Sequence, residues 1–237
     1  MGRVTGLWVY QTLGRRPNPE IMAARAQRHG IKWLTAQAIE GDEVLDRDWL
    51  RGLRRATRKR DMRLGVHGFI GRPHPKAAAE AKAMARAIDL AEADFAIVNA
   101  EIQYEQSTGR DSRKFVRAYR RLKPEFPSYL SSFGRPDLHP SLDWAAWARG
   151  GFRGMPQAYE NLNAENLKPI QCVNEWARFF KRTGLQPTLG CFAEGGHPHL
   201  PIPRLVKSVR DVPRLRFNIF RHGTVTTAEL DALSAVE

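Results

Sequence analysis

The chain has 237 residues, of which 42% are hydrophobic and 27% are charged, and its formal net charge is +13. These proportions are those of a globular protein with a sizeable core, and no apolar run is long enough for a transmembrane helix. The two cysteines, Cys172 and Cys191, are too few for a disulfide framework, so we expect reduced core thiols. The first residues lack the apolar region of a signal peptide, so we expect synthesis in the cytoplasm without export.

The positive charge is concentrated in two segments of the sequence. The basic residues are Arg51, Arg54, Arg55, Arg58, Lys59 and Arg60 in the first segment, and Arg113, Lys114, Arg117, Arg120, Arg121 and Lys123 in the second. A strongly basic protein favours polyanionic surroundings such as nucleic acid, anionic membranes or acidic cell-wall polymers. No nucleic-acid motif accompanies these residues, so we expect them to lie on outer helix faces and consider nucleic acid an unlikely partner.

Strand and helix patterns alternate from the start of the chain. The first half contains a predicted strand at 6–10, a helix between Asn18 and Gly30, a strand at 32–39, a helix with Trp49, Leu50 and Leu53, a strand at 63–70, a helix at 75–93, a strand at 94–101 and a helix at 115–122. The strands are short, mostly apolar runs, which is typical of parallel strands that are covered on both faces. Asn18 followed by Pro19 predicts a helix start, because asparagine caps helices and proline fits their first turn.

The same alternation continues to the end of the chain. The second half contains a predicted strand at 128–132, a helix at 143–148, a strand at 152–159, a helix at 168–183, a strand at 188–193, a helix at 203–209, a strand at 215–220 and a helix at 226–236. The helix at 168–183 should turn an apolar stripe with Trp176 and Phe180 toward the sheet. Thr226 or Thr227 is expected to cap the last helix.

Eight strand–helix units in succession predict a single (β/α)8 TIM barrel that forms one domain over residues 1–237. The alternative is an open doubly wound sheet, which carries a glycine-rich phosphate-binding turn after its first strand. The segment at 11–17 occupies that position here and contains one glycine. The sequence therefore favours the barrel.

Active sites of such barrels lie at the C-terminal ends of the strands. Glu101 and Glu194 follow the predicted fourth and seventh strands, which makes them the candidate catalytic residues. Glycosidases use two carboxyl groups about 5 to 5.5 Å apart when they retain configuration and about 6.5 to 9.5 Å apart when they invert it. Two alternatives remain open, namely that Glu101 pairs with Arg135 and that Glu194 belongs to an exposed loop.

Further polar and aromatic residues fall at strand ends and are expected to bind the substrate. They are Asn99, Tyr104, Gln157, Tyr159, Tyr10 and Glu40. Amides recognise sugar hydroxyls, and aromatic rings, Tyr104 among them, stack on sugar faces. His197 and His199 lie near Glu194, but two histidines around a proline are a weak metal signal, so we expect neither a metal nor another cofactor.

Three strand-end runs carry a resemblance to a known family: residues 96–101, 129–134 and 154–159. Together they resemble glycoside-hydrolase-like TIM barrels of bacteriophages and prophages, similar in plan to phage lysozyme-type barrels. The fourth strand of those barrels ends in Asp-x-Glu, where this chain has Asn99-Ala100-Glu101. The resemblance implies that Glu101 is the general acid and that Asn99 takes the place of the assisting aspartate, orienting a substrate acetamido group.

A second glycosidase clan is also similar. It uses Asn-Glu at strand four and a nucleophilic glutamate at strand seven. Glu194 fits that plan, although Ala100 separates Asn99 from Glu101.

Two functions follow as expectations. The first is a glycoside hydrolase acting on bacterial cell-wall polysaccharide or peptidoglycan, associated with a phage particle. The second is a non-catalytic virion structural or wall-binding TIM barrel, with other virion proteins as partners, because fold alone does not imply activity.

Overall fold

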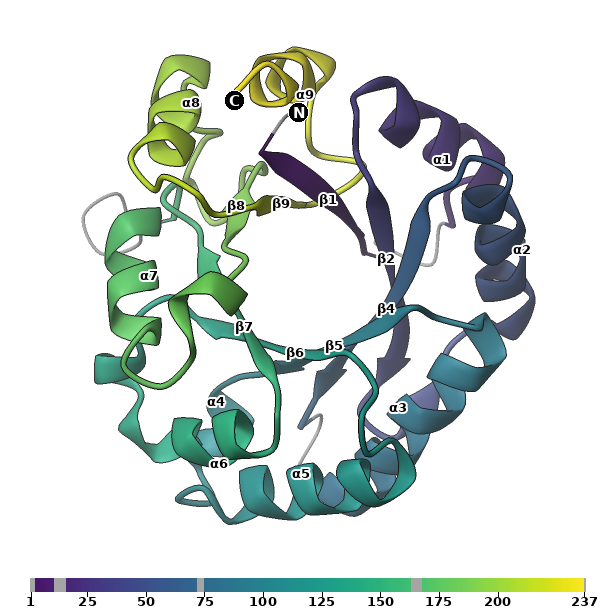
Figure 1. Cartoon of the computed structure of the whole chain (residues 1–237), viewed down its shortest axis with the longest axis vertical. Helices are drawn as coiled ribbons and strands as arrows, with labels where there is room; N and C mark the ends of the chain where they lie inside the picture. The colour runs from purple at the N-terminus through teal and green to yellow at the C-terminus, as the bar shows by residue number, and fades with distance from the viewer. Residues whose placement is uncertain (1–2, 11–15, 72–74, 163–167, 237) are drawn as a thin grey trace.

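The structure is a computed structural model that describes residues 3–10, 16–71, 75–162 and 168–236. Eight parallel strands form a closed barrel with helices around its outside, as Figure 1 shows in a view down the barrel. The order around the barrel is β1-β9-β8-β7-β6-β5-β4-β2, and pairing of β1 with β2 closes it. The predicted (β/α)8 TIM barrel is therefore confirmed, and the open-sheet alternative is excluded.

Each predicted strand overlaps one strand of the barrel. The bounds are β1 Val4–Val9, β2 Trp33–Glu40, β4 Arg63–Ile70, β5 Phe95–Ala100, β6 Ser128–Phe133, β7 Arg153–Ala158, β8 Thr188–Gly190 and β9 Phe217–Phe220. One additional strand, β3 Glu43–Val44, pairs antiparallel with the end of β2. Two residues are too few for a recognisable period, which explains why the sequence did not predict β3.

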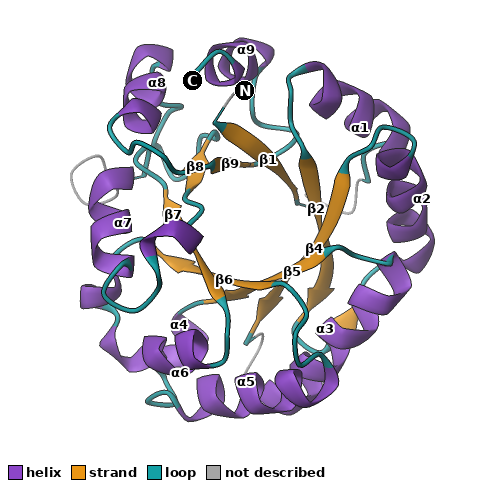
Figure 2. Cartoon of the chain, viewed as in Figure 1, coloured by secondary structure: helices purple, strands orange, loops and turns teal. Residues whose placement is uncertain are grey.

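The outer helices follow the strands in the predicted order (Figure 2). They are α1 Pro19–Arg28, α2 Arg47–Arg58, α3 Ala77–Ala91, α5 Arg110–Leu122, α6 Trp144–Arg149, α7 Pro169–Trp176, α8 Ile202–Arg210 and α9 Thr227–Ser234. A short additional helix, α4 Ile102–Glu105, follows β5 directly, and three-residue 3-10 turns occupy Pro136–Leu138, Pro140–Leu142 and Arg182–Gly184.

Side-chain caps fix two of the helix starts that the sequence indicated. Asn18 Oδ1 accepts hydrogen bonds from the backbone N–H groups of Glu20 at 2.9 Å and Ile21 at 3.2 Å. Thr226 and Glu229 form a reciprocal capping box at the start of α9. Such caps supply partners for N–H groups that the first helical turn leaves free.

The helix predicted at 168–183 is shorter than expected, since α7 ends at Trp176 and Phe180 lies beyond it. Both side chains are nevertheless buried, and their rings stack at 5.1 Å. A Cβ atom on Gly154 of β7 would lie 2.6 Å from the Trp176 ring. Trp176 therefore faces the sheet as predicted, but the stripe is completed by a turn rather than by one continuous helix.

Side chains on each strand alternate between the barrel interior and the helices, as strand geometry requires. On β5, Phe95 and Ile97 belong to the interior cluster, whereas Ala96 and Val98 pack beneath the helices. The interior cluster consists of Trp8, Trp33, Phe95, Ile97, Tyr129 and Met155. Trp33 and Phe95 begin their strands, so this cluster fills the barrel interior from its N-terminal end, and Asn99 and Gln157 lie nearer the C-terminal ends of β5 and β7.

The arginine-rich α2 lies on the outer wall, as predicted (Figure 1). Arg58 pairs with Glu92 at 2.7 Å, and Arg54 pairs with Asp94, which immediately precedes β5, at 2.8 Å. These contacts place the basic cluster near the N-terminal ends of the strands. It is therefore remote from the end that carries Glu101.

Two other sequence expectations concern the whole chain. The cysteines are unpaired and buried, and burial raises the pKa of Cys172 to about 12, which keeps its thiol protonated. Within the described residues, no helix combines the length and the apolar character that crossing a lipid bilayer requires.

Candidate active site

Strand β5 places two of the predicted site residues at the C-terminal end of the barrel. The alternation that sends Phe95 and Ile97 inward gives Asn99 the next inward position, and Glu101 comes directly after the strand. Both side chains are half-buried. They lie where the fold leaves the barrel interior open to polar groups.

Asn99, Glu101 and Gln157 form a hydrogen-bonded trio that links β5 to β7, the next strand but one in the barrel. Asn99 Nδ2 donates to Glu101 Oε1 at 3.0 Å, and Gln157 Nε2 donates to the same oxygen at 3.0 Å and to Asn99 Oδ1 at 2.8 Å. Gln157 reaches them from β7. Two amide donors on one oxygen therefore hold the Glu101 carboxyl group in one orientation.

The second oxygen, Glu101 Oε2, has no hydrogen bond from any residue that the structure describes. A carboxyl group held through one oxygen keeps the other for a proton or a ligand. The alternative pairing with Arg135 is wrong, because Arg135 Nε donates to Asp137 at 2.8 Å.

Tyr159 follows β7 and adds a phenol to the same end of the barrel. Its ring stacks on Phe220 at 5.5 Å and meets Phe192 edge-on at 5.3 Å. Burial, followed by the negative charges of Glu101 and Glu194, raises the pKa of Tyr159 well above its usual range. The phenol therefore stays protonated at neutral pH and keeps a proton that it can donate.

Glu194 lies in a tight turn beyond β8, not in a strand. Its backbone N–H donates to His197 O at 3.1 Å, and the His197 N–H donates back at 2.9 Å. Gly195 and Gly196 have φ values of +59° and +83°, a conformation that favours glycine. Glu194 is exposed, in agreement with the exposed-loop alternative, although its charge still acts on Tyr159.

Tyr10 belongs to an aromatic cluster that spans neighbouring strands. The cluster consists of Trp8, Tyr10, His67, Tyr159, Phe192 and Phe220. Tyr10 stacks on His67 with centroids 6.3 Å apart and meets Phe220 at 5.8 Å. Ring faces at the end of a barrel suit sugar binding.

The remaining two predicted residues differ from this group. Glu40 is the exposed last residue of β2 and pairs in register with Glu43 of β3, so it lies at the rim. Tyr104 is fully buried, and its hydroxyl donates to the buried carboxylate of Glu80. The prediction that the Tyr104 ring stacks on a sugar is therefore wrong, because α4 directs the Tyr104 side chain toward α3 and α5.

The two histidines that follow Glu194 differ in their surroundings. His199 Nδ1 lies 2.8 Å from Glu229 Oε1 on α9, away from the exposed His197. Across the part of the chain that the structure describes, no three His, Cys, Asp or Glu side chains form a group that could bind a metal.

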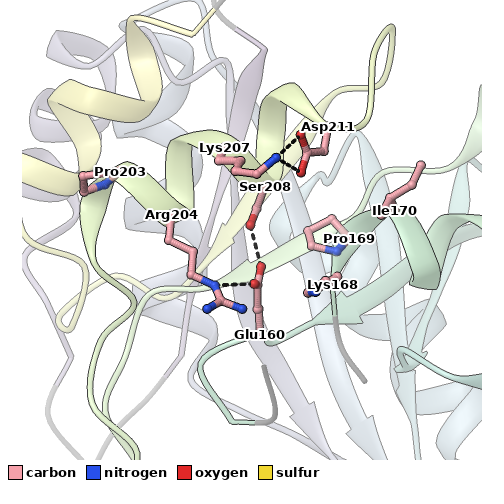
Figure 3. A pocket seen from close by; sticks show the side chains of 9 residues that line it. All are labelled: Glu160, Lys168, Pro169, Ile170, Pro203, Arg204, Lys207, Ser208 and Asp211. Atoms are coloured by element: carbon pink, nitrogen blue, oxygen red, sulfur yellow. Dashed lines mark hydrogen bonds and ion pairs between the residues drawn. The ribbon is translucent and has the colours of Figure 1, made fainter. Parts of the chain in front are cut away.

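A cavity of about 590 Å³ lies between α7 and α8, outside the barrel (Figure 3). Glu160 lines this cavity. Its side chain points away from the barrel interior because consecutive residues of an extended chain point in opposite directions and the preceding Tyr159 points toward the interior. Arg204 Nε donates to Glu160 at 2.7 Å, Ser208 donates to the other oxygen, and Lys207 pairs with Asp211 at 2.8 Å. These groups satisfy one another, so the cavity is a structural ion-pair site that takes no part in the trio.

Two site residues were not selected from the sequence, His67 and Arg221. The period of two on β4 sends His67 inward, and the strand-end rule applies to Arg221, which directly follows β9. Arg221 lies over the rings of Tyr10 and Phe220, at 5.4 Å from each centroid. Both signals were in the sequence, but neither separates a site residue from a structural one.

No protein-family model matches the chain, and a comparison with curated proteins finds no match. Solved structures with the same fold include a class V chitinase from Pseudomonas fluorescens Pf-5, at TM-score 0.74 and 7% identity over 98% of this chain and 99% of that one. The Bacillus cereus spore cortex-lytic enzyme SleL matches at TM-score 0.70 and 8% identity over 100% of this chain and 76% of that one. The glycoside hydrolase domain of PgaB (BpsB) from Bordetella bronchiseptica matches at TM-score 0.71 and 10% identity over 100% and 98%. At such identities the likeness shows a shared fold, whose solved neighbours include glycoside hydrolase barrels.

Proposed function

We propose that this chain is a glycoside-hydrolase-like barrel that cleaves a bacterial cell-wall polysaccharide, with Glu101 as the general acid. The observation that carries the proposal is the trio, in which Glu101 Oε1 accepts two amide hydrogen bonds and Oε2 is left for the proton. Solved neighbours named as chitinases and as a spore cortex-lytic enzyme support the same reaction class. The basic surface supports an anionic polymer as the substrate.

In the proposed reaction, Glu101 Oε2 protonates the glycosidic oxygen as its bond to the anomeric carbon breaks. Proton transfer by a positioned carboxyl group contributes about 10²- to 10⁴-fold in rate. Glu194 acts as the nucleophile or as the base that activates water, according to its distance from Glu101. In some glycosidases an acetamido group of the substrate takes the nucleophile's place.

Substrate positioning falls to the groups around Glu101. Asn99 and Gln157 orient the carboxyl group and offer amide contacts to an acetamido or hydroxyl group. Tyr159 donates from its protonated phenol, Tyr10 supplies a ring face, and Glu40 contacts sugar at the rim.

The second candidate function is a non-catalytic wall-binding or virion structural barrel. Asn99 favours it, because an amide stands where the resembled family has an assisting aspartate and cannot carry a negative charge. The exposure of Glu194 favours it as well. Phage association, with a location in the virion and virion partners, is proposed on the sequence resemblance alone, and detection of the chain in purified particles would test it.

A reducing-end assay on peptidoglycan, chitin and a panel of other polysaccharides separates the two candidates. Release of new reducing ends by the native chain supports the hydrolase. Binding to peptidoglycan without release supports the wall-binding barrel. Glu194→Gln then tests the second carboxylate, since retained turnover would transfer the nucleophilic role to the substrate acetamido group.

A further inference from the structure

Arg221 lies at the C-terminal end of the barrel, where backbone hydrogen bonds to neighbouring residues hold its segment in place. The following residue, His222, donates its N–H to Trp8 O at 2.7 Å, and Val225 N–H donates to Arg221 O at 3.1 Å. The guanidinium group lies over Tyr10 and Phe220, and its positive charge lowers the pKa of Tyr159, opposing Glu101 and Glu194. Arg221 therefore belongs to the group that surrounds the proposed general acid.

The guanidinium of Arg221 has no hydrogen bond and no ion pair with any residue that the structure describes. The side chain is half-buried, and its Nε atom is buried without a partner. Arg120, which is similarly covered, donates to the Gly150 carbonyl at 2.6 Å and to the Phe126 carbonyl at 3.0 Å. The buried Nε of Arg54 also has no partner among the described residues, but the two other nitrogens of Arg54 bind Asp94, whereas Arg221 has no such ion pair. An unpaired buried donor costs about 1 to 3 kcal/mol, which a bound anion would offset.

The guanidinium group keeps its donors for a ligand. Its central carbon lies 5.4 Å from the ring centroids of Tyr10 and Phe220, and such contacts attract the positive charge to the rings without a hydrogen bond to a described residue. The N–H groups of a guanidinium form a fork that matches the two oxygens of a carboxylate. A sugar residue that binds beside this aromatic cluster and carries a carboxylate would bring that group to the guanidinium.

We propose that Arg221 is a specificity-determining residue that binds a carboxylate on the polysaccharide, so that the site selects acidic sugars over neutral ones. This inference rests on the proposed function. A phosphodiester polymer fits less well, because its charge lies between sugars and not on the sugar that stacks. Binding energy from the Arg221–carboxylate contact is expected to favour the acidic glycan by about 10- to 100-fold.

The test measures binding by calorimetry with the full chain, so it does not depend on turnover. The acidic probe is peptidoglycan glycan freed of its peptides, in which each lactyl group ends in a free carboxylate. The neutral probe is a chitin oligosaccharide of equal length, which has the same acetamido backbone without the lactyl group. A third probe, a hyaluronan oligosaccharide, carries its carboxylate on a uronate ring and thus distinguishes the source of the anion.

We expect the native chain to bind a carboxylate-bearing probe at least tenfold more tightly than the chitin oligosaccharide. Arg221→Gln should abolish that ratio, and Arg221→Lys should retain part of it because the charge remains without the fork. Arg86→Gln, which removes a charge from the exposed face of α3, controls for the overall charge and should keep the ratio. Circular dichroism confirms that each variant is folded.

Equal binding of acidic and neutral probes by the native chain would overturn the role of Arg221 while leaving the proposed function intact. An unchanged preference of Arg221→Gln for the acidic probe would also overturn the role of Arg221 and leave the proposed function intact. Preferential binding of a teichoic-type phosphate polymer would replace the carboxylate with a phosphate and would also overturn the inference. Failure to bind any glycan would contradict both this inference and the proposed function.

Discussion

His67 is a buried histidine inside the barrel, and its burial gives the stability of the fold a definite dependence on pH. Its side chain is 2% exposed, its Nδ1 lies 3.3 Å from Thr35 Oγ1, and Trp8 covers it at 4.7 Å. Its Nε2 has no partner among the described residues. Burial lowers the pKa of His67 from 6.5 to about 3, so the folded chain keeps the imidazole neutral.

The sign of the effect follows from proton binding. Below pH 6.5 the unfolded chain protonates His67 and the folded chain does not, so stability falls as the pH falls toward 3. The slope approaches about 1.4 kcal/mol per pH unit, which corresponds to a loss of about 2 kcal/mol between pH 7 and pH 5. His222, whose pKa burial lowers to about 4, adds a similar dependence in the same range.

Replacing His67 by Gln removes its titration while keeping a polar side chain of similar length. Urea unfolding of the native chain and of His67→Gln at pH 7, 6 and 5 isolates the contribution of His67, because His222 titrates in both proteins. The difference in unfolding free energy between the two proteins should shift by about 2 kcal/mol toward the variant from pH 7 to pH 5. A difference that stays constant across this range would refute the reasoning.

Two further predictions concern packing and hydrogen bonding. Gly154→Ala should cost about 1 to 3 kcal/mol in urea unfolding, because the new methyl group would lie 2.6 Å from the Trp176 ring; an unchanged midpoint would show that the ring moves aside without cost. Tyr104→Phe should cost about 1 to 3 kcal/mol, because it deprives the buried Glu80 carboxylate of a donor. The Tyr104→Phe variant should bind glycan with native affinity, and weakened binding would show that Tyr104 takes part in substrate binding.

The sequence predicted the barrel because every strand–helix unit carries a local signal. Buried parallel strands read as apolar runs, and caps such as Asn18 and Thr226 satisfy the first N–H groups of a helix whatever the tertiary context. The short elements β3 and α4 were not predicted, since two to four residues carry no period. The early end of α7 at Trp176 was missed because the apolar stripe continues through the following turn.

Site residues were predictable to the extent that strand position decides them. Asn99, Glu101, Gln157 and Tyr159 lie where the strand-end rule places them, and the trio joins three of them. The prediction that Tyr104 binds substrate was wrong because the short helix α4, directly after β5, turns the Tyr104 side chain away from the barrel opening. Arg221 directly follows β9, where the strand-end rule places site residues, but the lack of partners that distinguishes it depends on distant segments meeting in space.

The proposed role of Glu101 is tested most directly by turnover of a polysaccharide that the native chain cleaves, measured for Glu101→Gln. An amide at this position keeps an oxygen for the Asn99 and Gln157 donors but cannot donate an acidic proton. Glu125→Gln, at an exposed position beyond α5, serves as the matched control.

We predict that Glu101→Gln lowers kcat by about 10²- to 10⁴-fold, while glycan binding by calorimetry and the unfolding midpoint stay close to those of the native chain. The control should retain native turnover. Native turnover in Glu101→Gln would contradict the account, because the proton would then come from another group.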